Sequence, residues 1–306
     1  MPRQIGALKA RVEYVGIAAL ARGLAAIPLE RAVRFGAALG DFVARIDRFN
    51  RPIAMRNLAI AFPEKSDAER RAIVRGMYRN LGRMLAEFTH FSDLDRGNIE
   101  RYVTYDTREN LNRALELAEG RGALIVTAHY GNFELLALAH SAYGYRLAIV
   151  QRPLRNPLIA KLVNDARTRM GNQIITRKKG GRAIFSALRE NRHVAIALDL
   201  DVRHGVFVDF FGMKASTSDG VARLAAAASV PVVPAFMVRE GDSPRHRIVV
   251  LPVVEMASGG DREACVVENT QRITKVIEEM IRRHPDHWNW IHRRWKTRPP
   301  GEKRFY

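Results

Sequence analysis

Short β-rich runs alternate with helical runs in the second half of this sequence, and this alternation restricts the fold more than any other feature. The runs typical of strands are residues 123–128, 146–151, 173–176, 193–198 and 230–238, with helical patterns between the first four. Such alternation predicts a mostly parallel α/β sheet flanked by helices. Ligands of these sheets bind beyond the carboxyl ends of the strands, so we expect functional residues there.

The chain before residue 105 has a different pattern, with apolar residues at helical spacing. Residues 50–62 and 66–91 repeat apolar side chains every three or four positions, and Ser66 and Glu69 are placed as a capping box. We therefore expect two parts: a helical, membrane-associating N-terminal region (1–105), and an α/β core with a Trp- and Arg-rich tail (106–306).

The first two apolar segments are candidates for membrane contact. Residues 14–28 are fewer than the roughly 20 needed to span a bilayer, and Arg22 interrupts them. In the next stretch Phe35, Phe42 and Ile46 recur on one helical face, with basic residues on another. A helix lying in the membrane surface and an ordinary core helix both fit this pattern.

The charge of the chain narrows the classes of partner. Fifty Lys and Arg against 32 Asp and Glu give a formal charge of +18, which favours an anionic membrane, nucleic acid or another acidic partner. An arginine-rich composition that follows from a GC-rich genome gives the same balance. The single cysteine, Cys265, excludes an internal disulfide and a thiolate zinc cluster, and it fits a reducing compartment.

The segment 127–134 (TAHYGNFE) is the strongest candidate for catalysis. His129 follows an apolar strand, Gly131 supplies a flexible bend, and Asn132 is placed to cap the helix that Glu134 enters. In that geometry the Glu134 carboxylate would hold one imidazole nitrogen while the other removes a proton. A histidine satisfied by a loop hydrogen bond is the alternative. HExxH and G-x-S-x-G motifs are absent from the sequence, so no metal site and no serine nucleophile is indicated.

Further polar side chains follow other strands of the predicted sheet. Arg152 comes after residues 146–151, and Asp199 and Asp201 come after 193–198, so we expect them to converge with His129 at one edge. Arg152 would bind an anionic group or a developing oxyanion. The aspartates would anchor Arg152 or Arg167. A surface arginine and ordinary strand-end carboxylates are the alternatives.

The motif around His129 resembles the H-x4-D/E motif of glycerolipid acyltransferases, and in its Glu form that of the late acyltransferases of lipid A biosynthesis. Other blocks similar to this family follow in order: QRPLRNP at 151–157, DLD at 199–201, GVFVDFFG at 205–212, VPVVP at 230–234 and WNWIHRRWKTRP at 288–299. Together they cover most of residues 50–300. The chain has Leu200 where the family commonly has Gln, and its N-terminal segment is less hydrophobic than is usual there.

The resemblance implies an acyltransferase that needs no cofactor and no metal. His129 would take the proton from a hydroxyl of an acylated, phosphorylated glucosamine lipid, with Glu134 orienting it. Arg152 and backbone donors near Gly131 would offset the negative charge. The donor would be an acyl-carrier protein or acyl-CoA. The expected substrate-binding residues are Gly131, Asn132, Arg152, Asn156, Arg167, Asp199 and Asp201.

Two aromatic groups belong to the same hypothesis. Phe207, Phe210 and Phe211 would line a channel for the acyl chain, although a run of phenylalanines is also typical of a core. The tryptophans in the segment 288–295, among basic residues, suit a membrane interface.

We therefore expect an enzyme on an anionic membrane surface, at the cytoplasmic face of the inner membrane, peripheral or N-terminally anchored. A lysophospholipid or a phosphatidylinositol mannoside is an alternative acceptor. A non-catalytic basic module that binds membrane or nucleic acid is the alternative from another class, but no nucleic-acid motif accompanies the basic residues, so nucleic acid is not expected as a partner.

Overall fold

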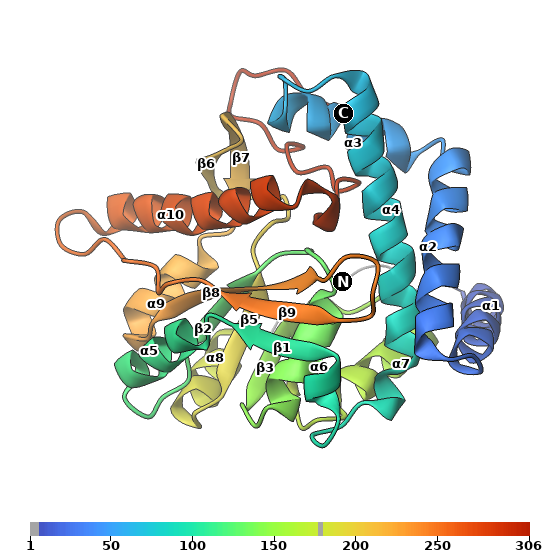
Figure 1. Cartoon of the computed structure of the whole chain (residues 1–306). Helices are drawn as coiled ribbons and strands as arrows, with labels where there is room; N and C mark the ends of the chain where they lie inside the picture. The colour runs from blue at the N-terminus through green and yellow to red at the C-terminus, as the bar shows by residue number, and fades with distance from the viewer. Residues whose placement is uncertain (1–5, 177–179) are drawn as a thin grey trace.

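The computed structural model describes residues 6–176 and 180–306, and it contains a seven-stranded sheet with helices on both faces (Figure 1). The strand order is β1-β9-β8-β2-β5-β3-β4. The strands of this sheet are β1 (Val103–Asp106), β2 (Leu124–Thr127), β3 (Leu147–Gln151), β4 (Gln173–Thr176), β5 (His193–Ala197), β8 (Val232–Arg239) and β9 (His246–Val250). All neighbours are parallel except β8 and β9. The predicted mostly parallel α/β sheet is confirmed.

All five predicted strands are present, within two residues of their expected ends. Sequence patterns missed β1 and β9, which extend the sheet beyond β8, and the antiparallel hairpin of β6 (Val206–Phe210) and β7 (Met213–Thr217). The β2 side chains alternate between the two faces, with Leu124 and Val126 in one apolar cluster and Ile125 in another.

The helices divide between the two faces of the sheet. One face is covered by α5 (Arg108–Ala118), α6 (Phe133–Ala142) and α7 (Pro157–Thr168), and the other by α8 (Gly180–Arg189), α9 (Gly220–Ala228) and α10 (Arg262–Arg283). The connections after β2 and β3 cover the first face, and those after β4 and β7 the second. The connections thus change from one face of the sheet to the other, and in sheets with such a change ligands bind beyond the carboxyl ends of the strands.

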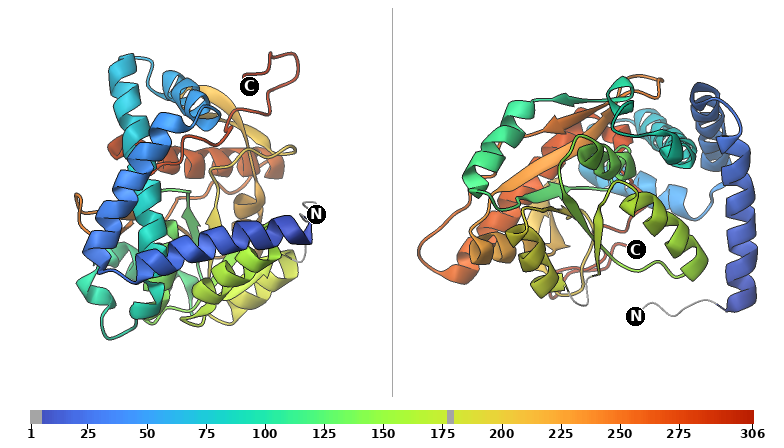
Figure 2. Two further views of the ribbon diagram at one scale, coloured as in Figure 1. Left: turned by 90° about the vertical axis from the view of Figure 1, so that its right-hand side faces the viewer. Right: turned by 90° about the horizontal axis from the view of Figure 1, so that it is seen from below.

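From residue 6 to the start of the sheet the structure has four α-helices and two short 3-10 helices. The α-helices are α1 (Ala7–Ala25), α2 (Leu29–Ile46), α3 (Asn50–Ala61) and α4 (Asp67–Thr89). The predicted capping box at the start of α4 is confirmed, because Ser66 and Glu69 each bond to the other's backbone N–H. Residues of α3 and α4, including Leu58 and Tyr78, belong to the same apolar cluster as the sheet. Figure 2 shows α1 alongside α7, and Asn156, the N-cap of α7, donates to the Ala10 carbonyl at 2.9 Å.

Helix α2 packs on α4 through glycines, and its large apolar side chains point outward. A β-carbon at Gly36, Gly40 or Gly82 would collide with backbone of the facing helix. Phe35 and Phe42 are 52% and 56% exposed. The sequence did not decide whether this apolar face of α2 packs in the core or contacts a membrane. In the structure the face is solvent-accessible, and small residues form the contact with the rest of the protein.

The C-terminal segment after α10 passes the edge of the sheet beside His129, and its tryptophans are buried. Trp288, Trp290 and Trp295 have no exposed surface, and Phe210 and Phe211 pack edge-on or tilted against them. The prediction that these tryptophans lie at a membrane interface is therefore wrong. A segment rich in Trp and Arg can have its tryptophans in the core or at a surface, and composition alone does not distinguish the two.

Candidate active site

A tight turn between β2 and α6 carries the predicted catalytic histidine. Gly131 has a φ of +54°, and a β-carbon there would collide with the Met237 carbonyl oxygen. Its N–H donates to the His287 carbonyl at 2.8 Å. Asn132 caps α6, as predicted, by accepting from the Leu135 N–H at 2.9 Å. The turn is therefore fixed at both ends and holds His129 at the carboxyl edge of the sheet.

The carboxylate that contacts His129 belongs to Asp199, which follows the neighbouring strand β5. His129 Nδ1 lies 2.9 Å from Asp199 Oδ1, and the His129 backbone N–H donates to Oδ2 at 2.8 Å. The Trp288 indole N–H donates to the same Oδ2 at 2.8 Å. Asp199 is fully buried, while 24% of the His129 side chain stays exposed. One buried carboxylate thus fixes both the backbone and the ring of His129.

The electrostatics of this pair define the tautomer. Burial raises the pKa of Asp199, but the charge of His129 and the hydrogen bonds outweigh it, so the pKa is lowered and the carboxylate is ionised. An ionised carboxylate only accepts hydrogen bonds, so Nδ1 carries the proton. Burial lowers the pKa of His129, but Asp199 outweighs that effect and raises it. The neutral ring then presents an unprotonated Nε2, the arrangement of a general base.

A second histidine lies against the first. The rings of His129 and His292 are 5.0 Å apart between centroids, at 63°. Burial, and then the positive charge of His129, lower the pKa of His292 to about 4, so it is neutral at physiological pH. Sequence analysis did not identify His292 as a neighbour of His129. The block at 288–299, which includes it, was the available signal.

Glu134 does not make the contact that the sequence suggested. Its carboxylate pairs with Arg167 in two hydrogen bonds, with Nε to Oε2 at 2.7 Å and Nη2 to Oε1, and Arg167 also donates to Gln151. The first turn of α6 directs Glu134 away from the ring and toward α7. Glu134 and Arg167 therefore form a pair on the wall of the cavity beside His129, and Asp199 takes the orienting position.

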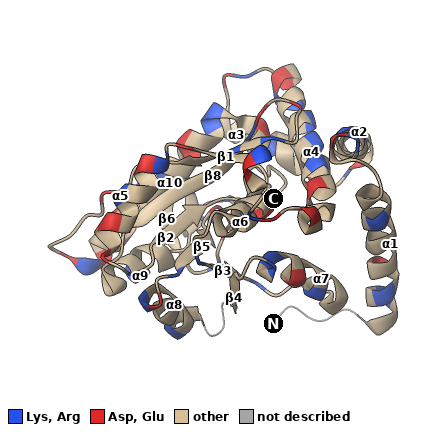
Figure 3. Ribbon diagram, turned by 60° about the horizontal axis from the view of Figure 1, so that its bottom comes forward, with Lys and Arg blue, Asp and Glu red and all other residues tan. Residues whose placement is uncertain are grey.

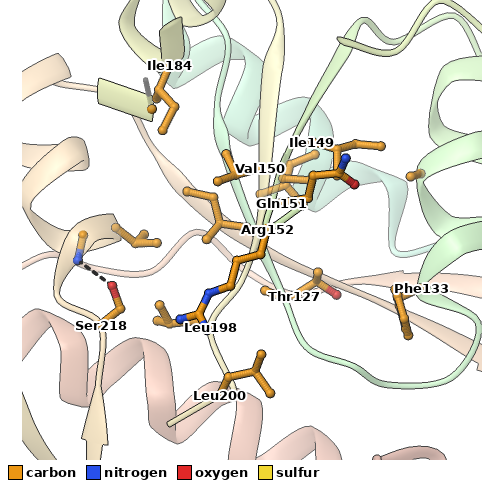
Figure 4. A pocket seen from close by; sticks show the side chains of 18 of the residues that line it. Thr127, Phe133, Ile149, Val150, Gln151, Arg152, Ile184, Leu198, Leu200 and Ser218 are labelled. Atoms are coloured by element: carbon orange, nitrogen blue, oxygen red, sulfur yellow. Dashed lines mark hydrogen bonds between the residues drawn. The ribbon is translucent and has the colours of Figure 1, made fainter. Parts of the chain in front are cut away.

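A cavity of about 700 Å³ opens at His129 and is lined mostly by apolar side chains. Arg152, Glu134 and Arg167 are among its polar lining residues. Figure 4 shows the Arg152 side chain extending between Thr127 and Leu198. Within the described part of the chain Arg152 has no ion-pair or hydrogen-bond partner, so its guanidinium is available to a ligand. Neither aspartate anchors Arg152 or Arg167, contrary to expectation.

The cavity replaces the acyl channel expected at the phenylalanines of β6 and the residue after it. Phe210 and Phe211 are buried in the core around the tryptophans, and none of Phe207, Phe210 and Phe211 lines the cavity. That prediction is wrong, and the apolar lining comes instead from β2, β3, β5 and the helices beside them.

Two predicted ligand-binding residues have structural contacts elsewhere. Asp201 accepts hydrogen bonds from the Thr297 N–H at 2.9 Å and hydroxyl at 3.0 Å, which holds the C-terminal segment. Asn156 is buried and joins α7 to α1. Neither lines the cavity. Both residues lie in blocks of sequence that resemble the family. Their short polar side chains bond to backbone groups, and sequence spacing alone does not distinguish such a role from ligand binding.

A buried charge cluster behind Asn132 was not predicted. Glu87 of α4 accepts from Asn132 Nδ2 at 2.7 Å, from both Nη atoms of Arg239 and from His246 Nε2. Burial raises the pKa of Glu87, but the neighbouring His246 and Arg239 charges outweigh that and lower it. The cluster ties the cap of α6 to α4, β8 and β9. Among the described residues no group of three or more His, Cys, Asp or Glu is arranged to hold a metal.

A histidine that is held by a buried carboxylate and faces an apolar cavity is suited to acid–base chemistry on a substrate with an apolar part. Residues 3–297 match the family model described as bacterial lipid A biosynthesis acyltransferase, so the chain belongs to that family and is an acyltransferase.

The curated relatives agree over nearly the full length. The chain is 31% identical to the lipid A biosynthesis lauroyltransferase of Escherichia coli (strain K12) over 281 residues, which covers 90% of this chain and 88% of that protein. It is 27% identical to the myristoyltransferase of the same strain over 295 residues, covering 96% and 89%. The palmitoleoyltransferase is 29% identical over 276 residues, covering 89% and 86%.

Among solved structures, the 1-acyl-sn-glycerophosphate acyltransferase of Thermotoga maritima aligns with a TM-score of 0.37 at 12% identity. The alignment covers 76% of this chain and 97% of that one.

Proposed function

We propose that this acyltransferase moves a fatty acyl chain from a thioester donor to a hydroxyl of a lipid A precursor. The observation that carries the proposal is His129, held by Asp199 through Nδ1 and open through Nε2 to an apolar cavity. The site offers a base and room for an alkyl chain. Family membership and the activities for which the relatives are named support the acceptor.

In the proposed reaction His129 Nε2 accepts the hydroxyl proton as the hydroxyl oxygen attacks the thioester carbonyl carbon. The resulting tetrahedral intermediate then expels the thiolate as the carbon–sulfur bond breaks. The thiolate takes the proton back from His129, so an ester and a thiol form and the enzyme is regenerated. Asp199 stabilises the imidazolium between these two steps.

The negative charge on the carbonyl oxygen needs donors close to His129. Arg152 lines the cavity and supplies a cationic fork. Helix geometry leaves the first-turn N–H groups of α6, at Phe133 and Glu134, without intrahelical acceptors. The Gly131 N–H is already bonded to the His287 carbonyl, so the backbone donors near Gly131 that the resemblance implies would be the N–H groups that follow it. We propose Arg152 and the start of α6 for this role.

The proposed donor is an acyl-carrier protein or acyl-CoA, and the proposed acceptor is a phosphorylated glycolipid. Both carry negative charge, and the chain has a formal charge of +18. Lys and Arg lie along α1, α2, α4 and α7 (Figure 3). The reaction as written needs no cofactor.

We propose that the enzyme binds the cytoplasmic face of the inner membrane through α1 and α2. Large apolar side chains are exposed on these helices, including Leu8 at 78% and Phe42 at 56%, and Phe49 follows α2 at 85%. Arg34 and Arg45 are exposed on α2 beside them. Apolar groups next to cations suit an anionic bilayer surface. Over the described residues, none of the helices combines the length and the apolar character that crossing a bilayer takes.

Mass spectrometry of lipid products tests the proposed function. The wild-type enzyme is incubated with acyl donors of several chain lengths, each with a lipid A precursor, a lysophospholipid or a phosphatidylinositol mannoside. We expect a single acyl addition to the lipid A precursor, and a loss of about 10²- to 10⁴-fold in His129→Ala. Transfer to another acceptor alone, or full activity in a folded His129→Ala variant, would refute the proposal.

Sedimentation with vesicles tests the membrane surface. Replacing Phe35, Phe42 and Phe49 with serine should weaken binding to anionic vesicles, while Leu117→Ser with Val267→Ser, exposed apolar residues on α5 and α10, should not. Binding should fall as salt is raised. Equal binding of both variants, or retention in the pellet after salt and carbonate washes, would contradict peripheral attachment through these helices.

A further inference from the structure

The central sheet opens between β3 and β5 on the side of the active site. The ladder between these strands joins Leu147 to His193 and ends at Ile149 and Ala195. Beyond that point β3 continues along β4, and β5 continues along β2 through the pairing of Thr127 with Ala197. The two strands therefore separate near their carboxyl ends.

The cavity passes through this opening to both faces of the sheet. Ala195 and Ile196 are successive residues of β5, so their side chains point to opposite faces, and both line the cavity. Neither is fully buried, although β5 lies between β2 and β3. On β3 the successive residues Ile149 and Val150 repeat this arrangement.

The cavity accordingly has two lobes. The α6 lobe contains Ile125, Leu136 and Ile149, on the face covered by α6 and α7. The α8 lobe contains Ile184, Ile196 and Val221, on the face covered by α8 and α9. In Figure 4 Ile184 and Ser218 lie on one side of Arg152, and Ile149 and Phe133 on the other.

Charged residues in the walls of the lobes are paired. In the α6 lobe Glu134 binds Arg167, and at the α8 lobe Arg223 binds Asp219 at 2.7 Å and also contacts Glu263. Paired charges do not demand a charged ligand. Among the charged side chains that line the cavity in the described part of the chain, Arg152 has no such partner, and it lies with the open Nε2 of His129 at the junction of the lobes.

We infer that the cavity holds two alkyl chains at once, one in each lobe, with their reacting groups meeting at His129. This inference rests on the proposed function, because an acyl transfer to an acylated lipid joins two chain-bearing substrates. One lobe takes the acyl chain of the thioester donor. The other takes a chain of the acceptor, which places the acceptor hydroxyl beside the thioester carbon. The crossing of the sheet keeps the two chains apart.

Neighbouring residues of β5 give a matched pair of variants. Ala195→Leu fills part of the α6 lobe and Ile196→Phe fills part of the α8 lobe, at the same height in the same strand. Ile149→Phe and Val150→Phe form a second pair on β3, for use if either first variant does not fold. Folding is checked by circular dichroism and thermal unfolding.

Steady-state kinetics provide the first readout. One series varies the chain length of the donor with a fixed acceptor, and the other varies the acceptor with a fixed donor. We expect one variant to change the preference between long and short donors by about tenfold or more, with the KM for acceptor unchanged. The other should raise the KM for acceptor by a similar factor and keep the donor preference. The two-chain inference is overturned if both variants change the donor preference. It is also overturned if one variant changes neither the donor preference nor the KM for acceptor.

Native mass spectrometry with decanoate gives a second readout that needs no turnover. We expect two bound chains in the wild type and one in each variant. One bound chain in the wild type would overturn the inference even if transfer to the lipid A precursor is observed. Two bound chains without any transfer would refute the proposed function and leave the two-lobed binding in place, so the two failures are distinguishable.

Discussion

Replacing Asp199 with asparagine should disable the proposed general base without removing the histidine. Two fixed donors, the His129 backbone N–H and the Trp288 indole, bond to the same oxygen Oδ2. The amide oxygen of asparagine will therefore occupy that position, and its NH2 group will face His129 Nδ1. Nδ1 must then accept, so the ring proton moves to Nε2, where no base remains. We expect turnover to fall by about 10²- to 10⁴-fold, equivalent to about 3–5 kcal/mol of transition-state stabilisation.

The pH dependence gives this prediction a direction. In the wild type burial lowers the pKa of His129, but the effect of Asp199 is larger and the pKa is raised. We therefore expect kcat/KM to increase as pH rises through this raised pKa. Asp199→Asn removes the raising effect and leaves burial, so the acid limb should move to lower pH. Asp201→Asn is the matched control, because Asp201 binds Thr297 and not His129. An acid limb that stays in place, with near-normal turnover, would refute the assigned pair.

Substitutions at three other positions test the parts around His129. Gly131→Ala should destabilise the protein by about 1–3 kcal/mol in urea unfolding, because φ is +54° and the new β-carbon collides with the Met237 carbonyl; unchanged stability would contradict this. Arg167→Lys should lower kcat/KM, because an ammonium cannot bind both oxygens of Glu134 as the guanidinium does; equal kinetics would show that the pair is dispensable. Arg152→Ala should impair donor kinetics more than Arg152→Lys, and wild-type rates in both would make Arg152 a surface cation.

Local patterns predicted the elements that local chemistry determines. The capping box at Ser66 and the Asn132 cap depend on neighbours within three residues, and both are present. Periodicity and strand-end positions also placed His129 and Asp199 at one edge of a parallel sheet. The order of the strands is a long-range property that periodicity does not contain, so the sequence did not show that β5 lies next to β2.

The choice between Glu134 and Asp199 shows this difference. The pairing of Thr127 with Ala197 brings the residues two positions later, His129 and Asp199, side by side. Glu134 is much closer to His129 in sequence, but one helical turn points it toward Arg167. The tail around Trp288 was misplaced for a related reason. A segment that is buried by contacts with distant elements has the same composition as one exposed at an interface.

The glycine contact between α2 and α4 places different requirements on the inner and outer faces of α2. Folding requires that Gly36 and Gly40 stay without a β-carbon, because backbone lies against backbone there. The outward positions, such as Phe35 and Phe42, make no comparable demand on the fold. Under the proposed membrane binding, we expect the outer surface of α2 to vary in sequence among related chains but to stay apolar and basic, while the inner glycines persist.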